Sequence, residues 1–193
     1  MIHTDPYTFY SYQDYLALRE DAGRFEIIEG LLLGMASPSP LHQIISKRLL
    51  VKFEQYLENK SCQVFGAPLD VRLFPGDGDK TTIVQPDLFI IFDKSKIPLE
   101  GAIQGAPDLV IEIVSPSTRS SDFLEKRRTY RQAGVKEYWI AVPFKKIHKY
   151  LLSSEGTSYS ETVFEVIGGS ITIPVSLFND ELVITLSENE IFR

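Results

Sequence analysis

Three stretches decide the fold of this 193-residue chain: VQPDLFII (residues 84–91), PDLVIEIV (107–114) and DFLEK (122–126). Glu112 is the residue in them that needs an explanation. Its neighbours from Leu109 to Val114 are apolar and most are β-branched, which is typical of a strand buried on both faces. An ionised carboxylate in such a strand costs several kcal/mol unless a partner compensates its charge. We therefore expect Glu112 to belong to a site.

Asp87 raises the same question at the start of a second apolar run. We expect one continuous strand from Val84 to Phe92, followed by a loop from Leu99 to Pro107. The simpler alternative for both acids is a position at a strand end, where the carboxylate faces solvent. The sequence leaves the two alternatives equally open for Asp87, and it favours burial for Glu112.

The third stretch indicates the start of a helix. Asp122 and Glu125 have the spacing of an acidic capping box, and Gly134 is a suitable left-handed terminator, so we expect a helix over residues 122–133. Lys126 falls on the apolar stripe of that helix, which faces the sheet. A lysine in such a place commonly buries its stem and keeps its ammonium in water. Because the carboxylates of Asp87 and Glu112 are expected on strands, a role in a functional site explains the position of Lys126 better.

Two carboxylates and a lysine suit metal-dependent hydrolysis of a phosphodiester bond. Two carboxylates about 4 Å apart repel each other by roughly 4 kcal/mol at an effective dielectric constant of about 20, and a divalent cation turns this repulsion into binding. Mg²⁺ takes one or two carboxylates, keeps several waters and accepts phosphate oxygens. The cation acidifies a water, and a nearby lysine orients that water or stabilises the developing charge.

At these residues the chain resembles the PD-(D/E)XK nuclease superfamily and, within it, a bacterial restriction-endonuclease-like branch. Pro86-Asp87 matches the first half-motif, and Glu112 matches the acid of the second. Val114 stands where the superfamily has its lysine, but this branch carries the lysine on the following helix, where Lys126 stands. The resemblance covers most of residues 24–143.

The resemblance implies a metal-dependent endonuclease that hydrolyses phosphodiester bonds in DNA. Asp87, Glu112 and the backbone carbonyl of Ile113 would bind Mg²⁺ or Mn²⁺. Lys126 would orient the attacking water or stabilise the transition state. Three weaker candidates for the same site lie in the N-terminal third of the chain: Glu26, Glu29 and His42.

A second function stays open on the same fold: a nucleic-acid-binding or assembly module that has lost turnover. Val114 favours this alternative, because it replaces the lysine of the superfamily. Val142 also favours it, because the family pattern leads us to expect an aspartate there. The acidic balance of the chain points the same way, whereas the intact acids and lysine favour an enzyme.

Two clusters of basic residues follow the candidate acids in the sequence. The first cluster, which we expect to contact the nucleic acid, consists of Arg119, Arg127, Arg128 and Arg131. The second cluster, which we interpret as a solvated hairpin tip, consists of Lys145, Lys146 and Lys149. The formal net charge of −6 argues against strong nonspecific DNA binding, which depends on lysine and arginine neutralising phosphates. A nuclease needs only a local basic surface.

The whole chain limits the class of protein. Residues 1–193 are expected to form a single restriction-endonuclease-like domain, and the 44% hydrophobic and 24% charged residues are ordinary for a globular protein. No stretch approaches the roughly 18 apolar residues of a membrane span, and the N-terminus lacks the pattern of a signal peptide. Cys62 is the only cysteine, which excludes a disulfide framework and fits a cytoplasmic location. We expect no membrane partner, and the sequence leaves a homodimer open.

The order of the elements predicts an α/β fold: a restriction-endonuclease-like mixed central sheet flanked by helices, with an antiparallel extension. Helices are expected after Ser11 and from Leu41 to about Asn59, with a hairpin between them that turns at Glu29-Gly30. The strand–helix–strand order from Leu109 to Val142 predicts parallel pairing of its two strands. Residues after Pro143 should form antiparallel hairpins.

Overall fold

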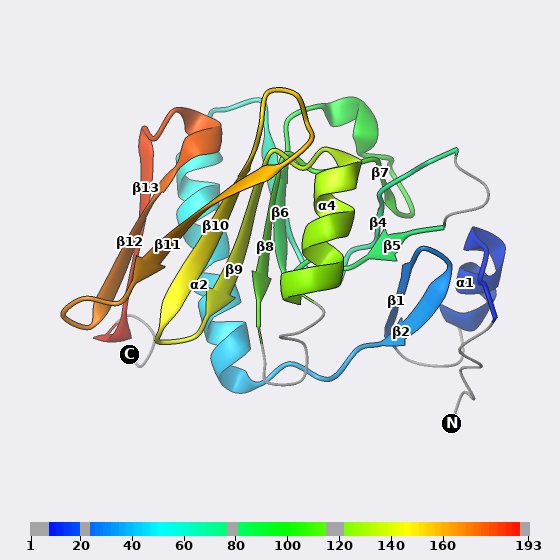
Figure 1. The fold of residues 1–193 in the computed structure, drawn as a ribbon, viewed down its shortest axis with the longest axis horizontal. Coiled ribbons are helices and arrows are strands. Elements are labelled where there is room, and N and C mark those ends of the chain that lie inside the picture. The colour runs from blue at the N-terminus through cyan, green and yellow to red at the C-terminus, as the bar shows by residue number, and fades with distance from the viewer. Residues whose placement is uncertain (1–7, 20–23, 77–80, 115–121, 190–193) are drawn as a thin grey trace.

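Figure 1 shows the fold in the computed structural model, which describes residues 8–19, 24–76, 81–114 and 122–189. The expected nucleic-acid contact Arg119 lies outside these residues, and so does the side chain of Asp122. Within the described part of the chain, no helix is both long enough and apolar enough to cross a membrane.

A six-stranded sheet forms the centre of the molecule, in the order β11-β10-β9-β8-β6-β3. Its strands are β3 (Gln63–Gly66), β6 (Leu88–Ile91), β8 (Leu109–Ile113), β9 (Glu137–Val142), β10 (Lys146–Leu152) and β11 (Tyr159–Glu165). Strands β8 and β9 pair in parallel, and the other neighbouring pairs are antiparallel. The predicted mixed sheet, its parallel crossover and its antiparallel extension are therefore confirmed.

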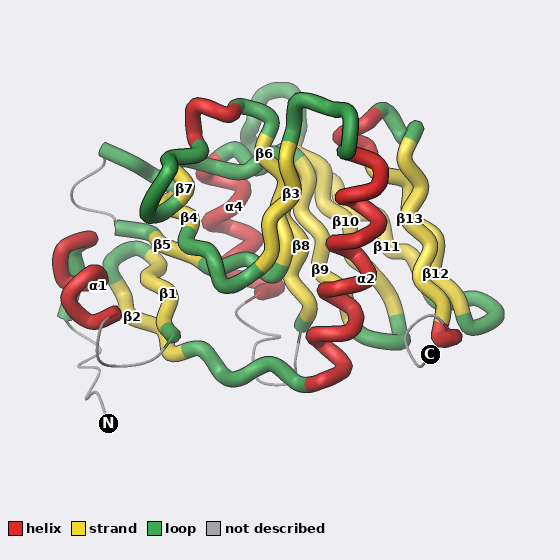
Figure 2. The backbone as a smooth tube through the Cα atoms, turned by 180° about the vertical axis from the view of Figure 1, so that it is seen from behind, coloured by secondary structure: helices red, strands yellow, loops and turns green. Residues whose placement is uncertain are grey.

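Helices cover both faces of this sheet (Figures 1 and 2). One face carries α2 (Pro40–Leu57), and the other carries the π-helical turn η2 (Asp122–Lys126) and α4 (Arg127–Ala133). Strand β8 is buried along its whole length. Its residues Leu109, Ile111 and Ile113 belong to the apolar cluster under α2. Because side chains alternate along a strand, Glu112 lies on the opposite face, under α4.

A second sheet holds the N-terminal hairpin beside the first, in the order β2-β1-β5-β4-β7. Its strands are β1 (Phe25–Ile28), β2 (Leu31–Gly34), β4 (Val71–Arg72), β5 (Ile83–Val84) and β7 (Ile103–Gln104). Helix α1 (Tyr12–Arg19) packs on this sheet through Tyr15, which is buried against Ile27 and Ile83. The predicted helix start is confirmed, because Ser11 and the side chain of Asp14 exchange hydrogen bonds.

The C-terminal part forms a two-stranded antiparallel sheet that packs against α2. It consists of β12 (Ser170–Val175) and β13 (Leu182–Ser187), joined through the short 3₁₀ turn η3 (Ser176–Phe178). A second 3₁₀ turn, η1 (Lys94–Lys96), follows β6. The apolar residues of this sheet, among them Ile173 and Ile184, belong to the same buried cluster as Leu49 and Phe53 of α2.

The expected continuous strand from Val84 to Phe92 is wrong. The chain forms β5 in the second sheet and β6 in the first, and Gln85-Pro86-Asp87 crosses between them. Pro86 has no backbone N–H to donate to a strand ladder, which favours the break. Asp87 therefore lies at the junction of the two sheets, directly before β6.

The expected helix over residues 122–133 begins differently from the prediction. Its first five residues form the π-helical turn η2, and the α-helix starts at Arg127 without a side-chain cap. A π-helical turn is wider than an α-helical one and is frequent at functional sites. The predicted end of the helix is confirmed, because Gly134 adopts a left-handed conformation with φ of 84°.

Two smaller expectations are also corrected. The expected loop from Leu99 to Pro107 contains β7, which pairs in parallel with β4. Lys149 is buried instead of solvated, because its Nζ donates to the carbonyl of Pro174 at 2.6 Å and lies 3.6 Å from Glu137. This lysine joins the C-terminal sheet to the central one, so it has no place in a basic surface.

Candidate active site

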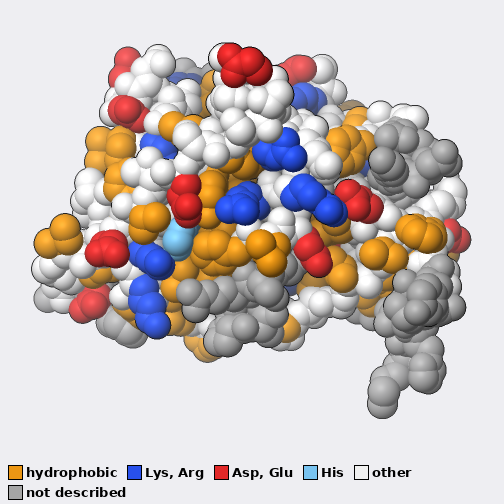
Figure 3. Space-filling view, in the orientation of Figure 1, with side chains coloured by type: hydrophobic (Ala, Val, Ile, Leu, Met, Phe, Trp, Pro, Cys, Tyr) orange, Lys and Arg blue, Asp and Glu red, His pale blue; other side chains and the backbone are white. Residues whose placement is uncertain are grey.

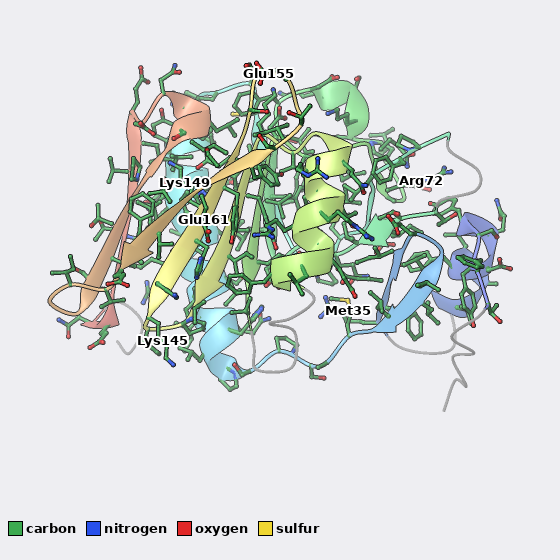
Figure 4. The ribbon with its side chains drawn as sticks, viewed as in Figure 1. Met35, Arg72, Lys145, Lys149, Glu155 and Glu161 are labelled. Atoms are coloured by element: carbon green, nitrogen blue, oxygen red, sulfur yellow. The ribbon has the colours of Figure 1, made fainter. Side chains whose placement is uncertain are left out.

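The sheet junction, the N-terminal hairpin, the first turn of α2 and the π-helical turn η2 surround one cleft of about 450 Å³. Six of the residues predicted for the site line this cleft: Glu26, His42, Asp87, Glu112, Ile113 and Lys126. In Figure 4 the cleft is marked by Met35, which also lines it and lies beside the start of α4. Segments far apart in the sequence thus bring these side chains together.

Lys126 places its ammonium between two buried carboxylates. Its Nζ lies 3.0 Å from Oε1 of Glu112 and 2.9 Å from Oε2 of Glu26. The three side chains are 5–7% exposed, so this lysine does not keep its charge in water. Its position on the buried stripe of the helix was predicted from the sequence, and the carboxylates explain why a charge is stable there.

A tyrosine completes the surroundings of Glu112. The hydroxyl of Tyr130 donates a hydrogen bond of 2.7 Å to Oε1, the oxygen that Lys126 also contacts. Burial and then the charge of Glu112 raise the pKa of Tyr130 well above its usual range, so this group stays a hydrogen-bond donor. Tyr130 was not among the residues predicted for the site. Its spacing of four residues from Lys126 was the available signal, because residues so spaced share a helix face.

A hydrogen-bond network that the sequence did not predict fixes Glu26. The backbone N–H of Gln85 donates to its carboxylate at 2.8 Å. The side-chain carbonyl of Gln85 accepts two hydrogen bonds from Arg24, and its amide donates to buried Asp70 at 2.8 Å. Asp70 also accepts a hydrogen bond from Tyr15 of α1. No local pattern in the sequence connects these four segments.

Asp87 is held from two sides at the sheet junction. Its Oδ2 accepts hydrogen bonds from the backbone N–H of Ile113 at 2.7 Å and from Nε2 of His42 at 2.9 Å. Since an ionised carboxylate only accepts, His42 carries its proton on Nε2. The side chain of Asp87 is 16% exposed to the cleft, and both of its partners among the described residues contact the same oxygen. Oδ1 is thus the oxygen that these contacts leave for a further ligand.

The charges around the cleft favour a cation. Its lining includes four carboxylates, those of Glu26, Asp87, Glu112 and Glu125, against the two cationic groups of Arg24 and Lys126. Among the described residues, no group of three or more His, Cys, Asp or Glu side chains is arranged to hold a metal ion. Mg²⁺ in proteins takes only one or two carboxylates and completes its shell with waters and phosphate oxygens. Asp87 and Glu112, the two acids predicted to hold the ion, both line this cleft.

The remaining predicted residues that the structure describes lie outside the cleft. Glu29 is half-buried at the turn of the hairpin, where it forms an ion pair of 3.0 Å with Arg128. Arg127, Arg128 and Arg131 line a separate cavity between α4 and the β10–β11 hairpin. Apart from Glu29, the predicted residues that the structure describes therefore line either an acidic cleft or a basic cavity.

Comparison with known proteins agrees with this fold. A crystal structure described as a putative nuclease belonging to DUF820, from Anabaena variabilis ATCC 29413, is similar with a TM-score of 0.68 and 22% sequence identity. The similarity covers 95% of this chain and 97% of that one. No curated protein matches the chain. The model of the Uma2 family, described as "Putative restriction endonuclease", matches residues 12–187. The chain therefore belongs to the Uma2 family of restriction-endonuclease-like proteins.

Proposed function

We propose that the protein is a metal-dependent nuclease that hydrolyses phosphodiester bonds in DNA, with Mg²⁺ or Mn²⁺ as its cofactor. One observation carries this proposal: the ammonium of Lys126 is held between Glu26 and Glu112 on the wall of the cleft that Asp87 also lines. The description of the family supports the same class of reaction.

A purely structural role explains this cluster poorly. Replacing a buried ion pair with apolar residues of similar volume is often neutral or stabilising, so such a pair is weak support for stability. Buried charges that sit together in a cleft are frequent at functional sites. The lysine and both glutamates are nearly inaccessible, yet all three line the cleft. A functional site accounts both for the burial of these charges and for their position on the wall of the cleft.

The donor set fits a divalent cation. Asp87, Glu112 and the carbonyl of Ile113 would hold the ion, which supplies an acidified water and a positive charge for the phosphate. The backbone N–H of Ile113 and the ring of His42 fix the carboxylate of Asp87 from two sides. Tyr130 does the same for Glu112. Side chains held in this way need little reorganisation during a reaction.

Lys126 supplies the proton donor of the cleft. Glu26 and Glu112 fix the position of its Nζ at 2.9 and 3.0 Å. An ammonium beside the carboxylate of Glu112 can donate a hydrogen bond to the attacking water or stabilise negative charge that develops on the phosphate. Glu26, which Gln85 holds, acts on the reaction through this lysine.

The cleavage test separates the nuclease from a module that has lost turnover. Purified protein should cut plasmid or single-stranded DNA in Mg²⁺ or Mn²⁺ and should be inactive in EDTA. Asp87→Asn should reduce the rate by more than about a hundredfold, because a bound cation contributes several kcal/mol and about 1.4 kcal/mol is a factor of ten. Glu54→Gln changes an exposed acid that lines neither this cleft nor the cavity of the arginines, and this control should cut at the wild-type rate. Wild-type protein that binds DNA without cutting any substrate would assign it to the module.

The second prediction concerns the buried ammonium. Lys126→Met keeps the stem but leaves two carboxylates without their cation, so it should lower the free energy of unfolding by about 3–5 kcal/mol. Adding Glu26→Gln to this variant should restore part of the loss, because it removes one of the uncompensated charges. Urea denaturation of both variants measures the difference. A Lys126→Met protein as stable as the wild type would contradict the buried ion cluster.

The third prediction concerns the cation. Mn²⁺ should raise the unfolding temperature of the wild-type protein, since a ligand bound only by the folded state adds about 2.7 kcal/mol at a hundredfold excess over Kd. Glu112→Gln should show a much smaller rise in unfolding temperature, because it removes the charge of one proposed metal ligand. Lys126 still has Glu26 as its ion-pair partner in this variant. The control Glu54→Gln should behave like the wild type. Equal shifts in all three proteins would place the cation elsewhere.

A further inference from the structure

A second cavity, of about 440 Å³, lies between α4 and the turn of the β10–β11 hairpin. It is lined by Leu124, Arg127, Arg128, Arg131, Tyr150, Thr157, Ser158, Tyr159 and Glu161. It shares none of these residues with the acidic cleft, although Lys126 of the cleft and Arg127 of the cavity are neighbours in the chain. The turn from η2 into α4 thus serves two cavities.

The charge of this cavity is positive, in a chain whose net charge is −6. Three guanidinium groups line it against one carboxylate, Glu161. Glu161 is already engaged, because it accepts hydrogen bonds from Nδ1 of His148 at 2.6 Å and from the hydroxyl of Tyr150 at 2.8 Å. Figure 3 shows Lys and Arg side chains gathered over α4, with acidic side chains on either side of them.

The arginines are held in place and still have donors to offer. Arg131 donates to the carbonyl of Thr157 at 2.7 Å, Arg128 pairs with Glu29, and the guanidinium of Arg127 lies over the ring of Tyr150 at 5.4 Å. A guanidinium has five N–H donors, and these contacts with described residues use a minority of them. The planar guanidinium presents two N–H donors side by side, so it can donate two parallel hydrogen bonds to two oxygens of one phosphate group.

The remaining walls suit the rest of a nucleotide. The half-buried ring of Tyr159 lines the cavity and supplies apolar surface for a base, and the buried ring of Tyr150 lies behind it at 6.0 Å. Ser158 and Thr157 on the hairpin turn add exposed hydroxyl groups opposite the arginines. A volume of about 440 Å³ lies within the range of roughly 300–1,000 Å³ that is usual for small-molecule sites.

We propose that this cavity is a second binding site, which takes one nucleotide unit through its phosphate group, away from the bond that is cut. The unit comes either from a nucleic-acid strand, which would continue from the cleft over α4, or from a free nucleotide. The first source rests on the proposed nuclease function, and the second does not. Lys126 and the three arginines would then let one helix both serve the cleft and hold the substrate strand.

The test is a binding measurement in EDTA, where no cleavage takes place. Arg127→Gln with Arg131→Gln removes two charges from the cavity. Lys60→Gln with Lys94→Gln removes two exposed charges that line neither cavity, and it is the matched control. Fluorescence anisotropy with a labelled oligonucleotide gives the affinity, and its dependence on salt gives the number of phosphate contacts.

For a strand as the source, the arginine pair should weaken oligonucleotide binding about tenfold or more and should flatten the slope of log affinity against log salt by roughly one unit per lost contact. For a free nucleotide, AMP should bind the wild-type protein and the control but not the arginine pair. If the arginine pair binds both oligonucleotide and AMP as the control does, the proposal is overturned.

A variant on the opposite wall keeps the test independent of folding. Ser158→Asp places a carboxylate at an exposed position of the cavity, so it should weaken the same ligand without disturbing the core. If Ser158→Asp and the arginine pair both bind oligonucleotide and AMP as the control does, the cavity is not a binding site. Because these measurements need no turnover, a protein that binds through the arginines but cuts nothing would support the second site and contradict the proposed nuclease.

Discussion

The structure depends on one buried ammonium. The Nζ of Lys126 joins the N-terminal hairpin, the central strand β8 and the turn η2, because its two carboxylate partners come from β1 and β8. Without this cation, Glu26 and Glu112 would be two buried carboxylates that had lost their positively charged partner, which is a costly arrangement in a protein interior. The ion cluster therefore constrains where the hairpin sits against the central sheet, and with it the shape of the cleft.

The elements around the cluster serve to hold it. Tyr130, one turn further along the helix, fixes the carboxylate of Glu112, and Gln85 fixes that of Glu26. Gln85 stands at the break between β5 and β6, so the same crossing of the chain also presents Asp87 to the cleft. A site built at the junction of two sheets in this way is supported by both of them, and its side chains have little freedom to reorganise.

The sequence predicted the parts of this site that depend on local pattern. The apolar run around Glu112 gave a buried strand, and helical spacing placed Lys126 on the face toward it. The partner of Lys126 at position 26 is 100 residues away, a pairing that periodicity cannot reveal. The break at Gln85 was missed because the apolar residues on both sides of it belong to different sheets. The π-helical turn was missed because the spacing of Asp122 and Glu125 satisfies an ordinary cap equally well.

The most direct test of the central claim is the anomalous signal of Mn²⁺ in crystals of the wild-type protein. If the proposed site holds the ion, one strong peak lies in the cleft, about 2.0–2.3 Å from carboxylate oxygens of both Asp87 and Glu112, with Lys126 still beside Glu112 and Glu26. A saturating concentration of Mn²⁺ that gives no peak there, or a peak that neither carboxylate touches, would contradict it. The ion cluster would then be a structural feature of the fold, and the cleft would need another explanation.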